Sequence, residues 1–332
     1  MNATGSLEMA IGFYSMQSAY MRPLRHSYIY EEAAREARLA EELGFDVFWM
    51  GEHHHAYDGY CPSLLPAAAY LAAQTSRITL ATGVLIVPHH GARRIAEGSA
   101  AIQSIAPGRF RLGVGIGYWK DEFDAAGTNL RTRHKLLEFA LDQLVNGDQR
   151  DRFGATDLWF GVGGPKALRR AARYGASVLL PQPTVERYKK SRALWEAEFR
   201  PRSDQKPRMT VFLDVWVECD PRRVEWIKGR LLEMWRNYAV NWIDDPTFQG
   251  LKPAEGFAAQ LAQREAMAHR ACNSFVVGTP SEVFEKLVPF VEAGADGFAF
   301  RMRFDGVGGP DLERSMRLLA DEVVPRLQRI AQ

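Results

Sequence analysis

The residues best suited to chemistry lie in one short run, Trp49-Met-Gly-Glu-His-His-His-Ala56. Imidazole changes its protonation state near neutral pH, so a histidine here suits proton transfer or hydrogen bonding to a reactant. If the run continues a β-strand, alternation sends the side chains of His53 and His55 one way and that of His54 the other. From the pattern alone we expect acid–base use of one histidine, and a buried, hydrogen-bonded role for His54.

A metal site is the main alternative use of these histidines. It would need at least three convergent ligands and groups that orient them, with Glu52 and Glu122 as further donors. The run matches neither H-E-x-x-H nor H-x-H with a distant carboxylate, and we therefore predict no metal. A second pair, His89 and His90, has no partner in the sequence and is interpreted as structural or as part of a pocket rim.

A glycine-rich window precedes the carboxylate Glu122. Glycines at 113, 115 and 117 remove side chains from one face of the backbone, which would let a flat ligand approach it. Asp121 and Glu122 then follow in what should be the first turn of a helix. Spacing alone favours a role in complementing the helix dipole over a role as a pocket carboxylate.

A second glycine turn follows at Phe160-Gly-Val-Gly-Gly-Pro-Lys-Ala-Leu168. Gly163 and Gly164 precede a proline that suits the first position of a helix, so free backbone N–H groups should face the end of the strand. Such a helix start binds anions, and Lys166 would add a positive charge. A phosphate site and an ordinary strand-to-helix turn are equally compatible with this pattern.

These windows need a scaffold that brings strand ends together. Short apolar runs alternate with helical stretches, and several runs are continuous enough for parallel strands buried on both faces. The predicted strands are Met9–Tyr14, Asp46–Met50, Ile78–Val87, Arg109–Val114, Leu158–Val162, Ser177–Leu180, Met209–Val217 and Gly297–Met302. Eight such units predict a (β/α)8 TIM barrel, with functional residues at the carboxyl ends of the strands. A doubly wound sheet is disfavoured because the first turn lacks G-x-G-x-x-G.

Helical patterns separate the strands. They cover Tyr30–Leu43, Pro62–Gln74, Ala92–Ser104, Arg131–Val145, Pro165–Tyr174, Val185–Phe199, Pro280–Ala293 and Asp311–Ile330. A further helical block at about residues 221–273 is longer than a barrel unit needs, and either core packing or a lid over the barrel mouth would explain its aromatic residues. We expect residues 1–332 to form one barrel domain that carries this block.

Composition narrows the class of protein. The chain has 332 residues, and its 42 Lys plus Arg nearly balance 40 Asp plus Glu, which disfavours a nucleic-acid or anionic-membrane binder. Three dispersed cysteines disfavour a disulfide framework. The first nine residues do not read as a signal peptide, and no apolar window is long enough for a membrane span. We expect a cytoplasmic protein that binds a small molecule.

Several motifs together resemble one family. The sequence is similar to the bacterial luciferase-like, flavin-dependent monooxygenases, of the luciferase α-chain type, over nearly its whole length. The motifs that carry this resemblance are Ile11-Gly-Phe, Gly44-Phe-Asp-Val-Phe-Trp-Met-Gly-Glu-His-His54, Gly108-Arg-Phe-Arg-Leu-Gly-Val-Gly115, Lys120-Asp-Glu-Phe123, Gly127-Thr, Val277-Gly-Thr-Pro-Ser-Glu282 and Ser315-Met-Arg-Leu-Leu-Ala-Asp-Glu-Val-Val-Pro325. The pair E-H-H and G-R-F-x-L-G-V-G, in this order, is the most specific of them.

The resemblance assigns roles residue by residue. His53 matches the family's catalytic histidine, His54 its neighbour, and Glu122 an acidic residue that tunes the flavin. The cofactor positions that it implies are Gly83 and Val84 against the flavin ring, Gly163 and Gly164 at the FMN phosphate, and Gly115 in the glycine-rich strand. The chain departs from the family at Gly115-Ile116, where luciferases often have Cys-Arg, and at Ala167, where they have a hydroxyl residue. Lys166 or Arg169 is then expected to replace the missing phosphate contacts.

The reaction implied by the resemblance has two components. Reduced FMN would come from a separate NAD(P)H:flavin reductase and react with O2 to a flavin C4a-peroxide, which oxygenates a small apolar substrate such as an aldehyde or a natural product. The family also implies a homodimer. The alternatives are an F420-dependent oxidoreductase on the same barrel, a non-catalytic flavin-binding paralogue, and a metal hydrolase built on His53, His54 and His55.

Overall fold

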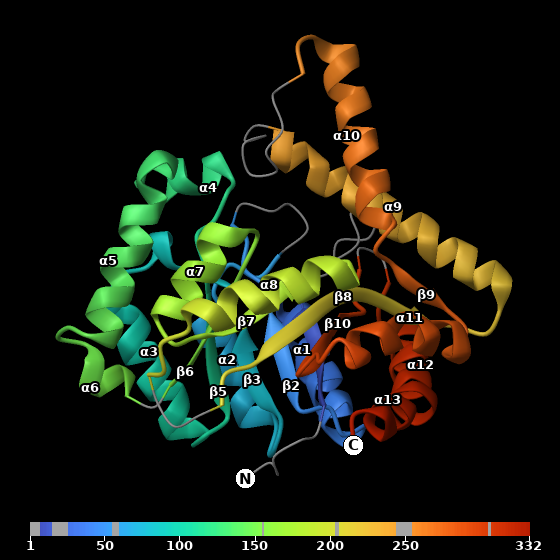
Figure 1. Cartoon of the computed structure of the whole chain (residues 1–332), viewed down its shortest axis with the longest axis horizontal. Coiled ribbons are helices and arrows are strands. Elements are labelled where there is room, and N and C mark those ends of the chain that lie inside the picture. Colours follow the sequence, from blue (N-terminus) through green and yellow to red (C-terminus); the bar gives the residue numbers. More distant parts are fainter. Residues whose placement is uncertain are drawn as a thin grey trace.

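Eight parallel strands close into a barrel in the computed structural model, which describes residues 7–14, 26–54, 60–154, 156–202, 206–243, 254–304 and 307–332 (Figure 1). The barrel strands are β1 (Glu8–Tyr14), β2 (Val47–Met50), β3 (Thr79–Thr82), β5 (Phe110–Gly115), β6 (Asp157–Gly161), β7 (Ser177–Pro181), β8 (Met209–Val217) and β10 (Gly297–Arg301). They pair in that order, and β10 closes the ring by pairing with both β1 and β8. The predicted (β/α)8 barrel is confirmed.

The predicted strand Ile78–Val87 is divided in the structure. After β3, the chain passes through a cis peptide between Gly83 and Val84 and then forms β4 (Leu85–Ile86), which also pairs with β5. A short 3-10 turn, Val87–His89, follows at once. Pro88 lacks the N–H that a longer strand would use in its ladder, which explains why the strand ends before its apolar pattern does.

The short strand β9 (Val276–Gly278) was not among the predicted strands. It pairs only with the end of β8, where Val215 lies opposite Val276, and so lies outside the closed ring. The motif that contains it is structural in part: Thr279 caps the following helix, and its backbone N–H donates to the Glu282 carboxylate at 2.7 Å. The V-G-T-P-x-E motif is therefore a strand end followed by a capping box.

Helices surround the barrel. They are α1 (His26–Glu42), α2 (Leu64–Gln74), α3 (Ala92–Ile105), α4 (Lys120–Ala125), α5 (Arg133–Val145), α6 (Arg150–Phe153), α7 (Pro165–Arg173), α8 (Val185–Glu198), α9 (Pro221–Ile243), α10 (Phe257–Cys272), α11 (Pro280–Glu292), α12 (Pro310–Leu318) and α13 (Val324–Ile330). The predicted helix Asp311–Ile330 contains a π-helical turn at Leu319–Val323, because Pro325 cannot donate to the carbonyl group four residues earlier. Among the described helices, none has the length and apolar character needed to cross a membrane.

Large side chains fill the inside of the barrel. The indole rings of Trp49 on β2 and Trp159 on β6 meet edge to face, with centroids 5.2 Å apart. A Cβ atom at Gly113 would lie 2.0 Å from the Thr82 carbonyl oxygen and 3.1 Å from the Trp49 ring. Barrel packing alone therefore requires glycine at position 113, whatever binds at the barrel mouth.

The helices α9 and α10 pack on each other and project from the ring of helices at one end of the barrel (Figure 1). A buried carboxylate connects α9 to the barrel: Asp214 on β8 accepts a hydrogen bond from Trp235 Nε1 of α9 at 3.2 Å. The same Asp214 pairs with Arg301 on β10, whose NH2 group lies 2.8 Å from Oδ2, and accepts a bond from Gln182 at 2.8 Å. The Asp214 carboxylate on β8 thus contacts β10, the residue that follows β7, and α9.

Replacement of Asp214 by alanine should destabilise the protein strongly. The substitution leaves the Arg301 guanidinium buried without its charge partner, which typically costs about 3–5 kcal/mol. Urea unfolding followed by circular dichroism measures the loss. The control is Glu186→Ala, which removes an exposed ion pair with Lys190 and should leave the unfolding midpoint unchanged. Equal midpoints for Asp214→Ala and the parent protein would contradict this account.

Candidate active site

Three sequence windows that are far apart in the chain meet at the carboxyl end of the barrel. Glu52, His53 and His54 follow β2, His90 follows β4 and its 3-10 turn, and Glu122 lies in the first turn of α4 after β5. Because β2, β3 and β5 are neighbours in the sheet, their carboxyl ends lie side by side. The histidine run does not continue the strand, which ends at Met50, and its two described members bond to different partners. His55 lies outside the described residues.

His53 is held between a carboxylate and a phenol. Its Nδ1 lies 2.9 Å from Glu122 Oε1, and its Nε2 lies 2.8 Å from the hydroxyl group of Tyr118. The backbone N–H of His54 donates to the same Glu122 oxygen at 2.7 Å. A carboxylate only accepts hydrogen bonds, so Nδ1 carries the proton and Nε2 is the acceptor in neutral His53. The site thus presets the imidazole for proton exchange at Nε2.

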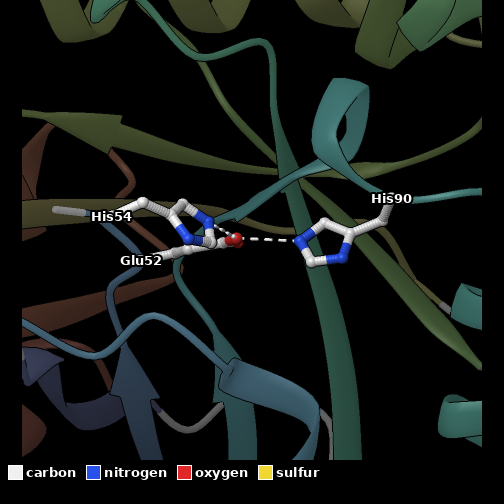
Figure 2. Close-up of side chains that lie close together, drawn as sticks. All are labelled: Glu52, His54 and His90. Atoms are coloured by element: carbon white, nitrogen blue, oxygen red, sulfur yellow. Dashed lines mark hydrogen bonds and ion pairs between the residues drawn. The ribbon is translucent and has the colours of Figure 1, made fainter. Parts of the chain in front are cut away.

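Glu52 bonds to His54, the residue that follows His53. Its Oε1 accepts hydrogen bonds from Nε2 of His54 at 2.7 Å and of His90 at 2.8 Å, as Figure 2 shows, and its Oε2 accepts the backbone N–H of Ile86 at 2.7 Å. Burial alone would raise the pKa of Glu52, but these bonds outweigh it and lower the pKa to about 2. The bond to Glu52 in turn raises the pKa of His54, although burial opposes the shift.

The cluster of Glu52, His54 and His90 has the residue types of a metal site. One ligand atom of each lies within 4.8 Å of the others. Tetrahedral zinc, with Zn–N distances of 2.0–2.1 Å, would hold its ligand atoms ~3.3 Å apart. The observed oxygen-to-nitrogen distances of 2.7 and 2.8 Å are instead those of charge-assisted hydrogen bonds. The cluster is thus organised as a hydrogen-bonded support, and the absence of a metal stays a prediction.

Two buried polar groups beside the cluster have no partner among the described residues. They are Oε2 of Glu122 and both ring nitrogens of His89. The His89 ring packs edge to face on Phe123, with centroids 4.5 Å apart, and burial lowers its pKa. Buried acceptors are almost always satisfied, so the free oxygen of Glu122 invites a donor from a bound ligand or water.

The predicted cofactor positions Gly83, Val84 and Gly115 lie next to one another. Val84 points toward β5 and β6, because a Cβ atom at Gly115 would lie 2.4 Å from Val84 Cγ2 and one at Gly161 2.8 Å from Cγ1. Glycine at 115 is therefore required by the Val84 side chain itself. The predicted contacts of Gly83, Val84 and Gly115 with a flavin stay predictions.

The turn at Gly163 and Gly164 leads into α7 and leaves open space, with no atom within 4 Å of a Cβ atom built at either position. Lys166 lies exposed in the first turn of α7. Arg187 of α8, which the sequence did not single out, donates to the Gly163 carbonyl oxygen at 3.3 Å. A cavity of about 370 Å³ lies between the turn and Arg187. No local pattern marks Arg187, because the contact depends on how α8 packs beside α7.

Three residues of the site make contacts that the sequence did not predict: Tyr118, His90 and Glu52. Of these, His90 was interpreted as structural or as part of a pocket rim, and Glu52 was considered only as a donor to a metal. For Glu52, the sequence does contain a signal of a functional role, because two histidines follow it directly. The pairing with His90 bridges 38 positions in the chain and has no local signature.

The family model described as luciferase-like monooxygenase matches residues 13–297. A stretch of 111 residues is 32% identical to the alkanal monooxygenase alpha chain of Photorhabdus luminescens and covers 33% of this chain and 30% of that protein. The chain spans about a third of the length of the curated relatives that it matches first.

Solved structures share the fold over almost the whole chain. The oxygenating constituent of 3,6-diketocamphane monooxygenase from Pseudomonas putida, in complex with FMN, has a TM-score of 0.71 at 18% identity and covers 97% of this chain and 99% of its own. An F420-dependent secondary alcohol dehydrogenase has a TM-score of 0.69 at 18% identity with the same coverage. At such identities the likeness shows the fold alone.

Replacement of Glu52 by glutamine should destabilise the protein in a pH-dependent way. A depressed carboxyl pKa stabilises the fold above 4.5 and loses this effect as the pH falls toward 2, whereas the raised His54 pKa stabilises it below 6.5 and loses this effect as the pH rises. The stability difference between parent and Glu52→Gln should thus be widest between pH 4.5 and 6.5.

Urea midpoints measured from pH 3 to pH 9 test this expectation. Glu31→Gln, on the exposed face of α1, is the control and should show a small difference that does not vary with pH. A Glu52→Gln deficit that is constant over the whole range, or widest at pH 9, would contradict the charge pairing.

Proposed function

The chain belongs to the luciferase-like monooxygenase family, and on this premise we propose that it oxygenates a small apolar organic substrate with O2 and reduced FMN. A separate NAD(P)H:flavin reductase would deliver the reduced flavin. The observation that carries the proposal is the hydrogen bond between Glu122 and His53 at the carboxyl end of the barrel, which fixes the imidazole with Nδ1 protonated and Nε2 hydrogen-bonded to Tyr118.

The residues present fit a flavin. The buried Oε2 of Glu122 lacks a donor among the described residues, and a flavin carries N–H groups that would supply one. After the neighbouring strand β6, the open turn at Gly163 and Gly164 starts a helix, and Arg187 places a guanidinium beside it. A phosphate suits both features. When bound, the reduced flavin supplies the electrons that activate O2.

The protein itself would contribute a proton donor or acceptor and a wall that excludes water. Glu122 holds the Nδ1 proton of His53, so that Nε2 can give up or take a proton without a change of tautomer. The rings of Tyr60 and Trp119 face His53 with centroids 4.8 and 6.3 Å away. These aromatic side chains give the site an apolar wall, which suits an aldehyde or a hydrophobic natural product.

Removal of the His53 imidazole should abolish oxygenation and spare flavin binding. Loss of a general acid or base costs roughly 10²–10⁴-fold in rate. We expect His53→Ala to lose product formation in an assay with a flavin reductase, NADH, FMN and a long-chain alkanal, while its FMN affinity changes little. His269→Ala, which removes an exposed histidine paired with Glu265 on the same helix α10, is the matched control and should keep full activity. An unchanged product yield in His53→Ala would exclude the proposed role of His53.

A second candidate is an F420-dependent oxidoreductase that transfers hydride without O2. Ala167 favours it, because this position in the first turn of α7 lacks the hydroxyl group that luciferases use at the FMN phosphate. Difference spectra recorded during titration with FMN and with F420 separate the two candidates. We expect FMN to bind at least tenfold more tightly, and the reverse order would replace the monooxygenase by the F420 enzyme.

A further inference from the structure

Tyr118 is positioned by the glycine that precedes it in the chain. It follows Gly117, which has a φ of +71° and no room for a side chain, since a Cβ atom there would lie 2.7 Å from Ile86 and 3.0 Å from the Phe123 ring. This glycine turn directs the chain back over the end of β2. There the Tyr118 hydroxyl group reaches His53 Nε2 at 2.8 Å, and the two rings meet edge to face with centroids 5.3 Å apart.

The hydrogen bond of Tyr118 occupies the one nitrogen through which His53 could exchange a proton. Nδ1 is committed to Glu122, and the His54 backbone N–H anchors the same oxygen of Glu122. In neutral His53, Nε2 therefore accepts the Tyr118 O–H. In protonated His53, the Nε2–H donates to the Tyr118 oxygen instead. Each protonation state thus has a defined hydrogen bond with the phenol.

A reactant can then exchange a proton with His53 in two ways. It displaces Tyr118 from Nε2, which breaks the 2.8 Å hydrogen bond between them, or it exchanges the proton through the phenol group of Tyr118. Tyr118 is only partly buried, whereas Glu122 is 1% exposed, so the phenol is the more accessible end of the series. The titratable groups that face His53 from the described elements around it are Glu122, Tyr118 and Tyr60.

We propose that Tyr118 is a catalytic residue and that its phenol oxygen, rather than His53 Nε2, exchanges the proton with the reacting molecule. The Tyr118 O–H gives its proton to an oxygen atom of that molecule, and the Tyr118 oxygen takes the Nε2 proton of imidazolium His53 in the same step. His53 ends neutral with Nδ1–H still bonded to Glu122, and solvent returns one proton to Nε2. The step rests on the proposed monooxygenase function.

Tyr118→Phe tests the relay, since it removes one oxygen atom and keeps the ring. The control is Tyr70→Phe, which removes the same atom from an exposed tyrosine on α2. The first readout needs no activity: ¹⁵N NMR of the histidine rings in the full chain. We expect the parent and Tyr70→Phe to show His53 with Nδ1 protonated and a hydrogen-bonded Nε2, and Tyr118→Phe to shift the Nε2 resonance downfield as its donor is lost.

The second readout is catalysis with FMN, a flavin reductase and a long-chain alkanal. We expect Tyr118→Phe to lower product formed per O2 consumed at least tenfold, to release the difference as H2O2, and to keep its FMN affinity within twofold. Tyr70→Phe should match the parent.

The outcomes separate the two proposals. If the parent neither binds FMN nor forms product, the proposed function fails, and the NMR result still decides whether the hydrogen bond to Nε2 exists. Parent-like coupling in Tyr118→Phe, a loss of activity that only follows weaker FMN binding, or an unshifted Nε2 resonance would each overturn the relay.

Discussion

The site depends on the burial of a charge. Glu52 is 4% exposed, and a carboxylate in such a place must be fully hydrogen-bonded or it would destabilise the fold. Three donors meet this requirement, and they come from two segments: the histidine run after β2, and the stretch from β4 to His90. The carboxylate therefore connects the end of β2 with the segment that follows β3. The position of His53, one residue along the chain, follows from this support.

The two adjacent histidines show how one local pattern produces two functions. The His54 ring bonds to Glu52, whereas the His53 ring bonds to Glu122 and Tyr118. The first ring has its pKa raised by a buried anion and acts as a support. The second is bonded at Nδ1 to Glu122 and at Nε2 to Tyr118. Both residues lie beyond the end of β2, so these hydrogen bonds, rather than the register of a strand, define the two environments.

The eight strands were predictable because parallel strands buried on both faces leave continuous apolar runs, and the functional windows were predictable because barrels place them at strand ends. Partners in neighbouring units of the barrel were not predictable, since the contacts of His90 with Glu52 and of Arg187 with Gly163 depend on how separate elements pack beside one another. The residue type also left Tyr118 ambiguous, because an aromatic ring gives no sign of whether its face or its hydroxyl group will be used. For Gly115 the sequence suggested room for a ligand, whereas the Val84 side chain already requires the glycine.

A second buried carboxylate, Asp214, holds together β8, β10 and α9. Asp214 pairs with Arg301 and also accepts a hydrogen bond from Trp235 of α9. The chain between β8 and β9 is therefore attached to the barrel by a hydrogen bond to this ion pair as well as by apolar packing. The Arg301 guanidinium also lies over the rings of Phe212 and Trp235, with centroid distances of 5.4 and 5.1 Å. Such stacking adds attraction without using any further hydrogen-bonding group. Because the charge is desolvated, any change in the shape of this side must keep Asp214 paired. Residues of α9 and α10 that do not contact Asp214 can thus change without breaking this ion pair, and Glu122 and Tyr118 hold His53 independently of it.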